Sequence, residues 1–232
     1  MRFLAFQISL IGILSLIIQS HIYAGSILGE VKFIGTPPKP MEIKVTSDQT
    51  YCGTSLPDES TLIGPNRGLK NSVIFIVKAS QDLPPSLVEN VLDNNGCRFA
   101  PHVLAMQRGE KLIVKNSDPK LHTIHTSMRQ ETIFNVPLPF RGLKIDVTEK
   151  IQKTGLIEVR CNTHGWMRGY IHVLDHPFFA VSDERGGFVI RNIPAGSYTL
   201  QAWHESAGVQ SKEIVVNGRD DLRVNFEFKI RH

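Results

Sequence analysis

The chain has 232 residues, of which 41% are hydrophobic, and a formal net charge of +4 with its histidines neutral. Basic residues are scattered singly among acidic ones, so the sequence lacks the basic runs of a nucleic-acid-binding protein and we expect no nucleic-acid partner. It also contains no Gly-rich phosphate loop, no Gly-x-Ser-x-Gly and no His-Glu-x-x-His. These absences give no support to a catalytic function.

Residues 1–24 have the pattern of a secretory signal peptide. Arg2 is followed by an uncharged run from Phe3 to Ile18, and the segment ends at the small residue Ala24. The apolar run is short for a membrane span. We therefore expect cleavage after Ala24 and an exported protein, periplasmic or secreted, that is not an integral membrane protein once the signal is removed.

Short alternating runs bounded by Gly, Pro and Asn recur after the signal, which predicts an all-β protein. The expected strands are 27–34, 41–45, 72–77, 103–106, 111–116, 132–135, 144–147, 156–161 and 170–174. A Pro-Pro pair followed by spaced apolar residues predicts one short helix within 81–96. Many short strands joined by turns favour a Greek-key sandwich or barrel.

The pattern changes near 175–177. Residues 187–200 contain a strand, a Pro-x-Gly turn and a second strand, and 223–231 alternates cleanly between apolar and polar positions. This part resembles the carboxypeptidase regulatory-like module, a small β-sandwich of the transthyretin or immunoglobulin-like type. The resemblance implies a supporting or recognition domain over 176–232, after a first domain over 25–175.

Three cysteines in an exported chain divide into a pair and one free thiol. Cys52 and Cys97 each lie beside a turn-forming glycine, and we predict a Cys52–Cys97 disulfide, as an oxidising compartment permits. Loop entropy alone gives such a bridge roughly 4 kcal/mol of stabilisation. The alternative is that both are buried thiols.

The remaining cysteine opens the motif Cys-x2-His-x2-Met, formed by Cys161, His164 and Met167. Ile157, Val159 and Cys161 fall on one face of a predicted strand, so the sulfur points the same way as the core. A loop between two strands that carries a thiolate, an imidazole and a thioether has the donors that copper prefers.

A further histidine completes the pattern. The strand 111–116 ends at Asn116, and His122 follows a Ser-Asp-Pro turn, some forty residues before Cys161. This spacing, with the short Cys-x2-His-x2-Met loop, resembles the cupredoxins, and the amicyanin-like members most of all. The resemblance implies one type 1-like copper ion, with His122, Cys161 and His164 as its three strong ligands and Met167 as a weak axial ligand. It also implies that His164 lies at the protein edge and serves as the electron port.

The chain departs from the family pattern beside the ligands. Leu121 stands where the family usually has Pro, Thr123 follows the histidine, and Asn162 follows the cysteine in place of Thr or Ser. The polar pair that braces the ligand loops is therefore expected in swapped form, with Thr123 bonding to Asn162. Asn116 or Thr123 is expected to hold the loop of the first histidine by hydrogen bonds.

Two more histidines are candidates for extra ligands or for groups that contact the ligands. His102 follows a proline, as the first ligand does in the family, but it precedes the strand 111–116 that leads to His122. It therefore fits the position of first ligand less well than His122 does. His125 lies three residues beyond His122 and is the other candidate.

The sequence favours one-electron transfer at a mononuclear copper site, in exchange with a redox partner protein that the sequence does not identify, and it does not favour an enzyme. Two alternatives stay open. One is a periplasmic protein that binds or delivers copper without redox cycling, motivated by His102, His125 and the missing proline before His122. The other is a domain of the same fold that has lost the metal and acts as a scaffold.

Overall fold

The structure is a computed structural model, and it describes residues 24–79 and 83–229. The predicted signal peptide lies outside the described residues except for Ala24. The regular secondary structure of the described chain is almost entirely β, which confirms the all-β prediction. No helix within 24–79 and 83–229 is long and apolar enough to cross a membrane.

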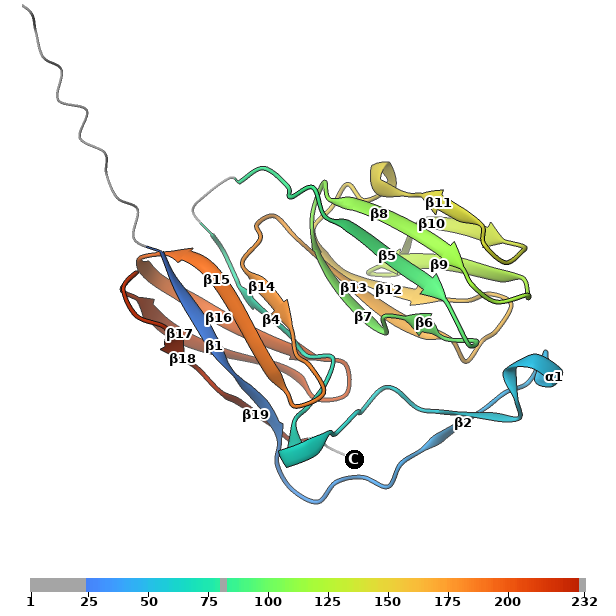
Figure 1. Ribbon diagram of the computed structural model, residues 1–232, viewed down its shortest axis with the longest axis horizontal. Helices are drawn as coiled ribbons and strands as arrows, with labels where there is room; N and C mark the ends of the chain where they lie inside the picture. The colour runs from blue at the N-terminus through green and yellow to red at the C-terminus, as the bar shows by residue number, and fades with distance from the viewer. Residues whose placement is uncertain (1–23, 80–82, 230–232) are drawn as a thin grey trace, which may run out of the picture.

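Two β-sandwiches lie side by side (Figure 1). We call the first the central sandwich, because its strands come from the middle of the chain. One of its sheets has the order β10 (Glu131–Leu138), β9 (His122–Met128), β12 (Gly155–Arg160), β13 (Arg168–Leu174), β7 (Val103–Gln107). The facing sheet has the order β11 (Lys144–Asp146), β8 (Lys111–Asn116), β5 (Glu89–Asn94), β6 (Phe99–Ala100). The short 3₁₀ helix η2 (Thr148–Lys150) follows β11.

The strands of the central sandwich form where apolar residues alternate. In β12, Ile157 and Val159 are fully buried while Glu158 and Arg160 are exposed. This is the period of two that a strand with one face on a core requires. Their side chains join Leu112, Ile124 and other residues in a single core between the two sheets.

We call the second unit the terminal sandwich, because it combines strands from both ends of the chain. One sheet has the order β15 (Gly187–Pro194), β1 (Ala24–Phe33), β18 (Leu222–Arg223), with β19 (Phe226–Phe228) also paired to β1. The other has the order β14 (Phe179–Val181), β4 (Val73–Ile76), β16 (Gly196–His204), β17 (Gly208–Val216). A separate apolar core lies between these sheets.

The set of strands in the terminal sandwich corrects the predicted domain limits. The prediction of one domain over 25–175 groups β1 and β4 with the metal-site strands, but β1 pairs with β15 and β4 pairs with β14 and β16. The physical reason is that alternation within a strand shows that one face is buried but not which sheet covers it. The resemblance of 177–232 to the carboxypeptidase regulatory-like module stays a prediction.

The chain crosses between the sandwiches several times. After β1 it runs out along β2 (Glu42–Lys44), forms the single turn α1 (Gln49–Cys52) against the central sandwich, and returns through β3 (Ser55–Pro57) and the 3₁₀ helix η1 (Pro65–Arg67) to β4 (Figure 1). We call residues 42–57 the arm. The β2–β3 ladder of the arm pairs Glu42 with Pro57 and Lys44 with Ser55.

One local prediction was wrong, and one strand was not predicted. The segment predicted to hold a helix has none in its described part, because residues 89–94 form β5 and pair in parallel with β8. The strand that begins at His122 was not predicted as a strand of seven residues, since its alternation is carried by polar side chains such as Thr126.

Candidate metal centre

Two neighbouring strands place the first two candidate ligands at one pole of the central sandwich. His122 is the first residue of β9, after the turn that follows β8, and Cys161 comes directly after β12. β9 and β12 pair antiparallel, with Arg160 opposite His125. The start of one strand and the end of the other therefore lie together. The loop between β12 and β13 then brings His164 back over the same pole.

The donor atoms of these three residues converge. The Cys161 Sγ lies 3.8 Å from the Nδ1 of His122 and 3.8 Å from the Nδ1 of His164, and the two Nδ1 atoms are 3.1 Å apart. All three side chains are buried. Donor atoms that each lie about 2.0–2.3 Å from one metal ion, at angles of about 100–120°, are separated from one another by roughly 3.1–4.0 Å. The cluster therefore fits a single ion of the first transition row.

Within the described residues, this is the one place where three or more His, Cys, Asp or Glu side chains lie close enough together to hold a metal ion. Two imidazoles and one thiolate, with a thioether nearby, form the donor set typical of copper. Met167 is 2% exposed, and its backbone N–H donates to the carbonyl oxygen of His164 at 2.9 Å. This tight turn brings Met167 back beside Cys161, whose N–H lies 3.4 Å from the Met167 carbonyl oxygen. The axial role of Met167 stays a prediction.

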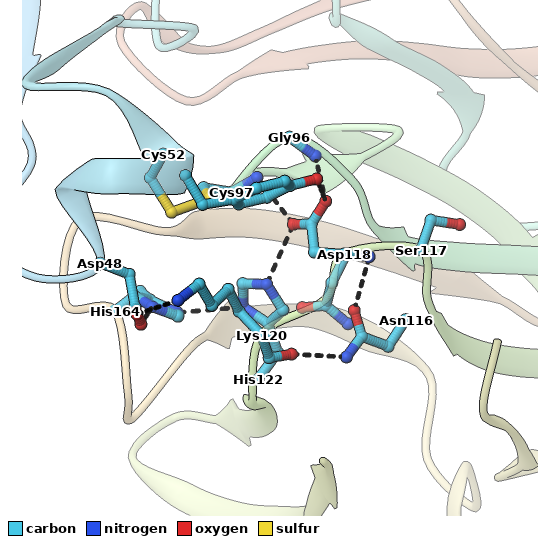
Figure 2. A network of polar contacts seen from close by, with 12 residues as sticks. Asp48, Cys52, Gly96, Cys97, Asn116, Ser117, Asp118, Lys120, His122 and His164 are labelled. Atoms are coloured by element: carbon cyan, nitrogen blue, oxygen red, sulfur yellow. Dashed lines mark hydrogen bonds and ion pairs between the residues drawn. A yellow bond between two sulfur atoms is a disulfide. The ribbon is translucent and has the colours of Figure 1, made fainter. Parts of the chain in front are cut away.

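Asp118 holds the ring of His122 from the far side. Its Oδ2 accepts a hydrogen bond from the His122 Nε2 at 3.0 Å, and both side chains are fully buried. The same carboxylate accepts the backbone N–H groups of Gly96 and Cys97 (Figure 2) and the hydroxyl of Tyr51. Burial raises the pKa of Asp118, but these donors outweigh it and bring the pKa down to about 2. The His122 ring is thus fixed with its Nδ1 toward Cys161.

His164 is held in the same way by Asp48, which belongs to the arm. The Asp48 Oδ2 lies 2.9 Å from the His164 Nε2, and its Oδ1 lies 2.8 Å from the Lys120 Nζ (Figure 2). His164 has no exposed surface. The expectation that His164 lies at the protein edge is therefore wrong, because the arm covers the edge of its ring. Its role as the electron port stays a prediction.

The side chains of the centre stabilise a thiolate beside an imidazolium. Burial raises the pKa of Cys161. Hydrogen bonds from His122 and from the backbone N–H groups of Thr123, His164 and Thr163 have a larger, opposite effect, so the pKa falls to about 6. Burial lowers the pKa of His122, whereas Asp118 and Cys161 raise it well above its ordinary value. A thiolate is the form of cysteine that binds metals. The centre therefore favours the ionisation state of Cys161 that a metal needs.

Of the hydrogen bonds predicted to hold the ligand loops, those of Asn116 are present and the one between Thr123 and Asn162 is not. The side-chain amide of Asn116 donates to the carbonyl oxygens of Lys120 and Leu138 at 2.8 Å each, so it does hold the loop of His122. The predicted bond between Thr123 and Asn162 is wrong. The Thr123 hydroxyl lies 3.3 Å from that of Thr163, one residue further along the loop.

Neither of the two additional histidines joins the cluster. His125 alternates away from the core in β9, and its two ring nitrogens lie 3.2 Å from the Asn162 Oδ1 and 3.0 Å from the Thr132 Oγ1. His102 lies between the two sandwiches, where its Nε2 contacts Glu205. The structure thus brings together His122, Cys161 and His164 and places His102 elsewhere.

The predicted disulfide is confirmed: Cys52 and Cys97 are bonded, and Cys161 is free and buried. Sequence reasoning did not single out Asp48, Asp118 or Tyr51. Asp118 had a local signal, since it lies in the turn between Asn116 and His122. Asp48 and Tyr51 had none, because their contacts with the centre span more than sixty residues of chain.

Comparisons with known proteins find only partial likenesses to solved structures. No protein-family model and no curated protein matches the chain. An oxidised amicyanin variant is 18% identical, over 37% of this chain and 82% of its own, with a TM-score of 0.33. A purple cupredoxin from Nitrosopumilus maritimus is 20% identical, over 37% of this chain and 100% of its own, with a TM-score of 0.32.

A copper-containing nitrite reductase from Thermus scotoductus is 22% identical, over 43% of this chain and 25% of its own, with a TM-score of 0.34. The three likenesses each cover part of the chain, and all have low identities and low TM-scores. They do not establish a family for this protein.

Proposed function

We propose that this protein is an exported copper protein that carries out one-electron transfer at a mononuclear type 1-like site. The observation that carries the proposal is the buried cluster in which the Nδ1 atoms of His122 and His164 and the Sγ of Cys161 converge within 3.8 Å. Met167 is the proposed weak fourth ligand. When bound, copper would supply a one-electron couple that none of the side chains has.

The chain's own residues supply the rigidity that such a site needs. Asp118 and Asp48 fix the two rings through their Nε2 atoms, and Asn116 fixes the turn before His122. Ligands held by a second layer of hydrogen bonds keep their positions when the charge of a bound metal changes. A site that does not rearrange suits electron transfer.

Copper titration of the oxidised mature protein, followed by its visible absorption spectrum, tests the proposal. We expect one equivalent of Cu(II) and an intense band from the copper–thiolate bond. Cys161→Ser should abolish the band with the fold retained, since Ile157 and Val159 keep β12 in the core. His122→Ala should remove it too, whereas His102→Ala should alter at most its intensity. A His102→Ala protein without the band would contradict the ligand set.

Two parts of the proposal concern the surroundings of the protein. Export is supported by the Cys52–Cys97 disulfide, which persists in oxidising compartments. A second, redox-active protein is the proposed partner. Fractionation of cells that express the full chain tests export: the mature protein should appear outside the cytoplasm without residues 1–24.

A second candidate is copper binding or delivery without redox cycling, and one observation favours it. His164 is fully buried beneath Asp48, so the ring edge that would meet a redox partner is closed. Tight copper binding with weak colour, and no reversible reduction in voltammetry, would select this candidate over electron transfer.

A further inference from the structure

Part of the arm forms a closed loop that packs against the central sandwich beside the candidate metal centre. Val45 donates its N–H to the carbonyl oxygen of Thr54 at 3.0 Å, which closes a small loop around α1. Val45 is fully buried and packs with Cys52, Cys97 and Trp166 against the central sandwich. We call residues 45–54 the cap.

Three contacts hold the cap to the central sandwich: one ends at the candidate ligand His164, one at Asp118, and one at Cys97, whose N–H binds Asp118. The Cys52–Cys97 disulfide places the cap next to the turn whose N–H groups bind Asp118. The Tyr51 hydroxyl donates to the Asp118 Oδ1 at 2.9 Å. Asp48 contacts the Nε2 of His164 at 2.9 Å (Figure 2).

The conformation of Asp48 suits it to this contact. Its carbonyl oxygen accepts the N–H groups of Tyr51 and Cys52 at 2.9 Å each, so its backbone is fixed by the turn of α1. Asp48 adopts φ 51 and ψ 30, a left-handed conformation that aspartate tolerates better than most residues. Lys120 binds its other carboxylate oxygen at 2.8 Å. The carboxylate is therefore held between Lys120 and His164.

From these contacts we infer that Asp48 is a positioning residue for His164, and that the cap it belongs to shields the donor cluster from solvent before any metal binds. The inference deepens the proposed function and rests on His164 and Cys161 being ligands of that site. Asp48 keeps the proton of His164 on Nε2, which leaves the Nδ1 lone pair facing Cys161. Entry of a metal then requires local opening of the cap and not unfolding of the sandwich.

Alkylation of Cys161 by iodoacetamide in the metal-free, disulfide-intact protein tests this inference. Cys161 is the free thiol and is 3% exposed, so its modification reports opening of the site. Loss of a hydrogen bond to a charged group, together with the strain of alanine at φ 51, should raise the rate roughly 10- to 100-fold in Asp48→Ala. Asp48→Asn retains one acceptor oxygen, so its rate should lie between those of wild type and Asp48→Ala.

Glu42→Gln is the matched control, because Glu42 is an acidic residue of the same arm whose carboxylate accepts the Ser55 hydroxyl and does not contact the centre. Its alkylation rate should stay within about twofold of wild type. A second readout is nitrogen NMR of the His164 ring. Wild type should show a protonated, slowly exchanging Nε2, and Asp48→Ala should show loss of that signal or a mixture of tautomers.

Low concentrations of urea separate local opening from global unfolding. The extra reactivity of Asp48→Ala should change little with urea, because opening of the cap exposes little surface. The inference is overturned if Asp48→Ala alkylates no faster than Glu42→Gln, or if wild-type Cys161 reacts as fast as in the unfolded chain. The assay contains no copper, so failure to form the copper–thiolate band would refute the proposed function without producing either of these results.

Discussion

Asp118 is the residue whose replacement should cost the central sandwich the most stability for the smallest chemical change. Its side chain is fully buried, and its two oxygens accept four hydrogen bonds. Asp118→Asn keeps the shape but removes the charge and turns one acceptor oxygen into a donor NH2 group. Two buried donors then face another donor, and the carboxylate partner of His122 is gone.

The magnitude follows from these contacts. Leaving a buried donor without a partner costs about 1–3 kcal/mol, and removing one member of a buried ion pair costs about 3–5 kcal/mol. We expect Asp118→Asn to lower the free energy of unfolding of the metal-free protein by about 3–5 kcal/mol. Urea denaturation near neutral pH, followed by circular dichroism and tryptophan fluorescence, measures this loss.

The matched control is Asp146→Asn in β11 of the same sandwich. The Asp146 carboxylate is exposed to solvent and accepts hydrogen bonds from the N–H and hydroxyl of Thr148, two residues along the chain. Its replacement should cost about 1 kcal/mol or less, as surface changes do. If Asp118→Asn costs no more than Asp146→Asn, the reasoning that the buried carboxylate organises the His122 pole is refuted.

Three further predictions concern other parts of the molecule. Met167→Leu should keep copper bound and raise its reduction potential in voltammetry, since an axial thioether is a weak ligand; loss of the metal would count against the axial role. Gly29→Ala should destabilise the terminal sandwich by about 3 kcal/mol, because its new Cβ would lie 1.7 Å from the Val224 carbonyl oxygen. Urea denaturation measures this loss, and an unchanged midpoint would contradict the placement of β1 in that sandwich. Burial lowers the pKa values of His172 and His204 to about 4 from 6.5, so as pH falls from about 6.5 to 4 the unfolded chain binds protons that the folded chain does not. The free energy of unfolding should therefore fall by up to about 3 kcal/mol per histidine over this range, and a flat profile of denaturation midpoint against pH would show that the two rings are not buried as neutral groups.

The metal centre was predictable from the sequence to the extent that it is local. Cys161, His164 and Met167 lie on one short loop, and the alternation of Ile157 and Val159 directs the sulfur toward the core. Both facts involve neighbours in the chain, so they can be recognised without the fold. The spacing from Asn116 to His122 is local in the same sense. The all-β class followed for the same reason, because the period of two is a property of each strand alone.

The pairing of distant segments was decided only by the tertiary structure. Nothing in the alternation of β1 shows that it joins β15 and β19 across nearly the whole chain, and the predicted boundary at 175 therefore misplaced it. His102 and His122 are both histidines near strand ends. It is the antiparallel pairing of β9 with β12 that brings His122 to Cys161 and leaves His102 with Glu205.

The covering of the candidate metal centre by the arm was also decided only by the tertiary structure. The sequence indicates that Cys52 bonds to Cys97, but not that the bond holds Asp48 against His164. That contact joins residues 116 positions apart, and it depends on where the arm leaves one sandwich and reaches the other. Short sequence motifs were enough to indicate which side chains this protein has for binding a metal. Only the three-dimensional arrangement determined that both imidazoles are backed by carboxylates and covered from solvent.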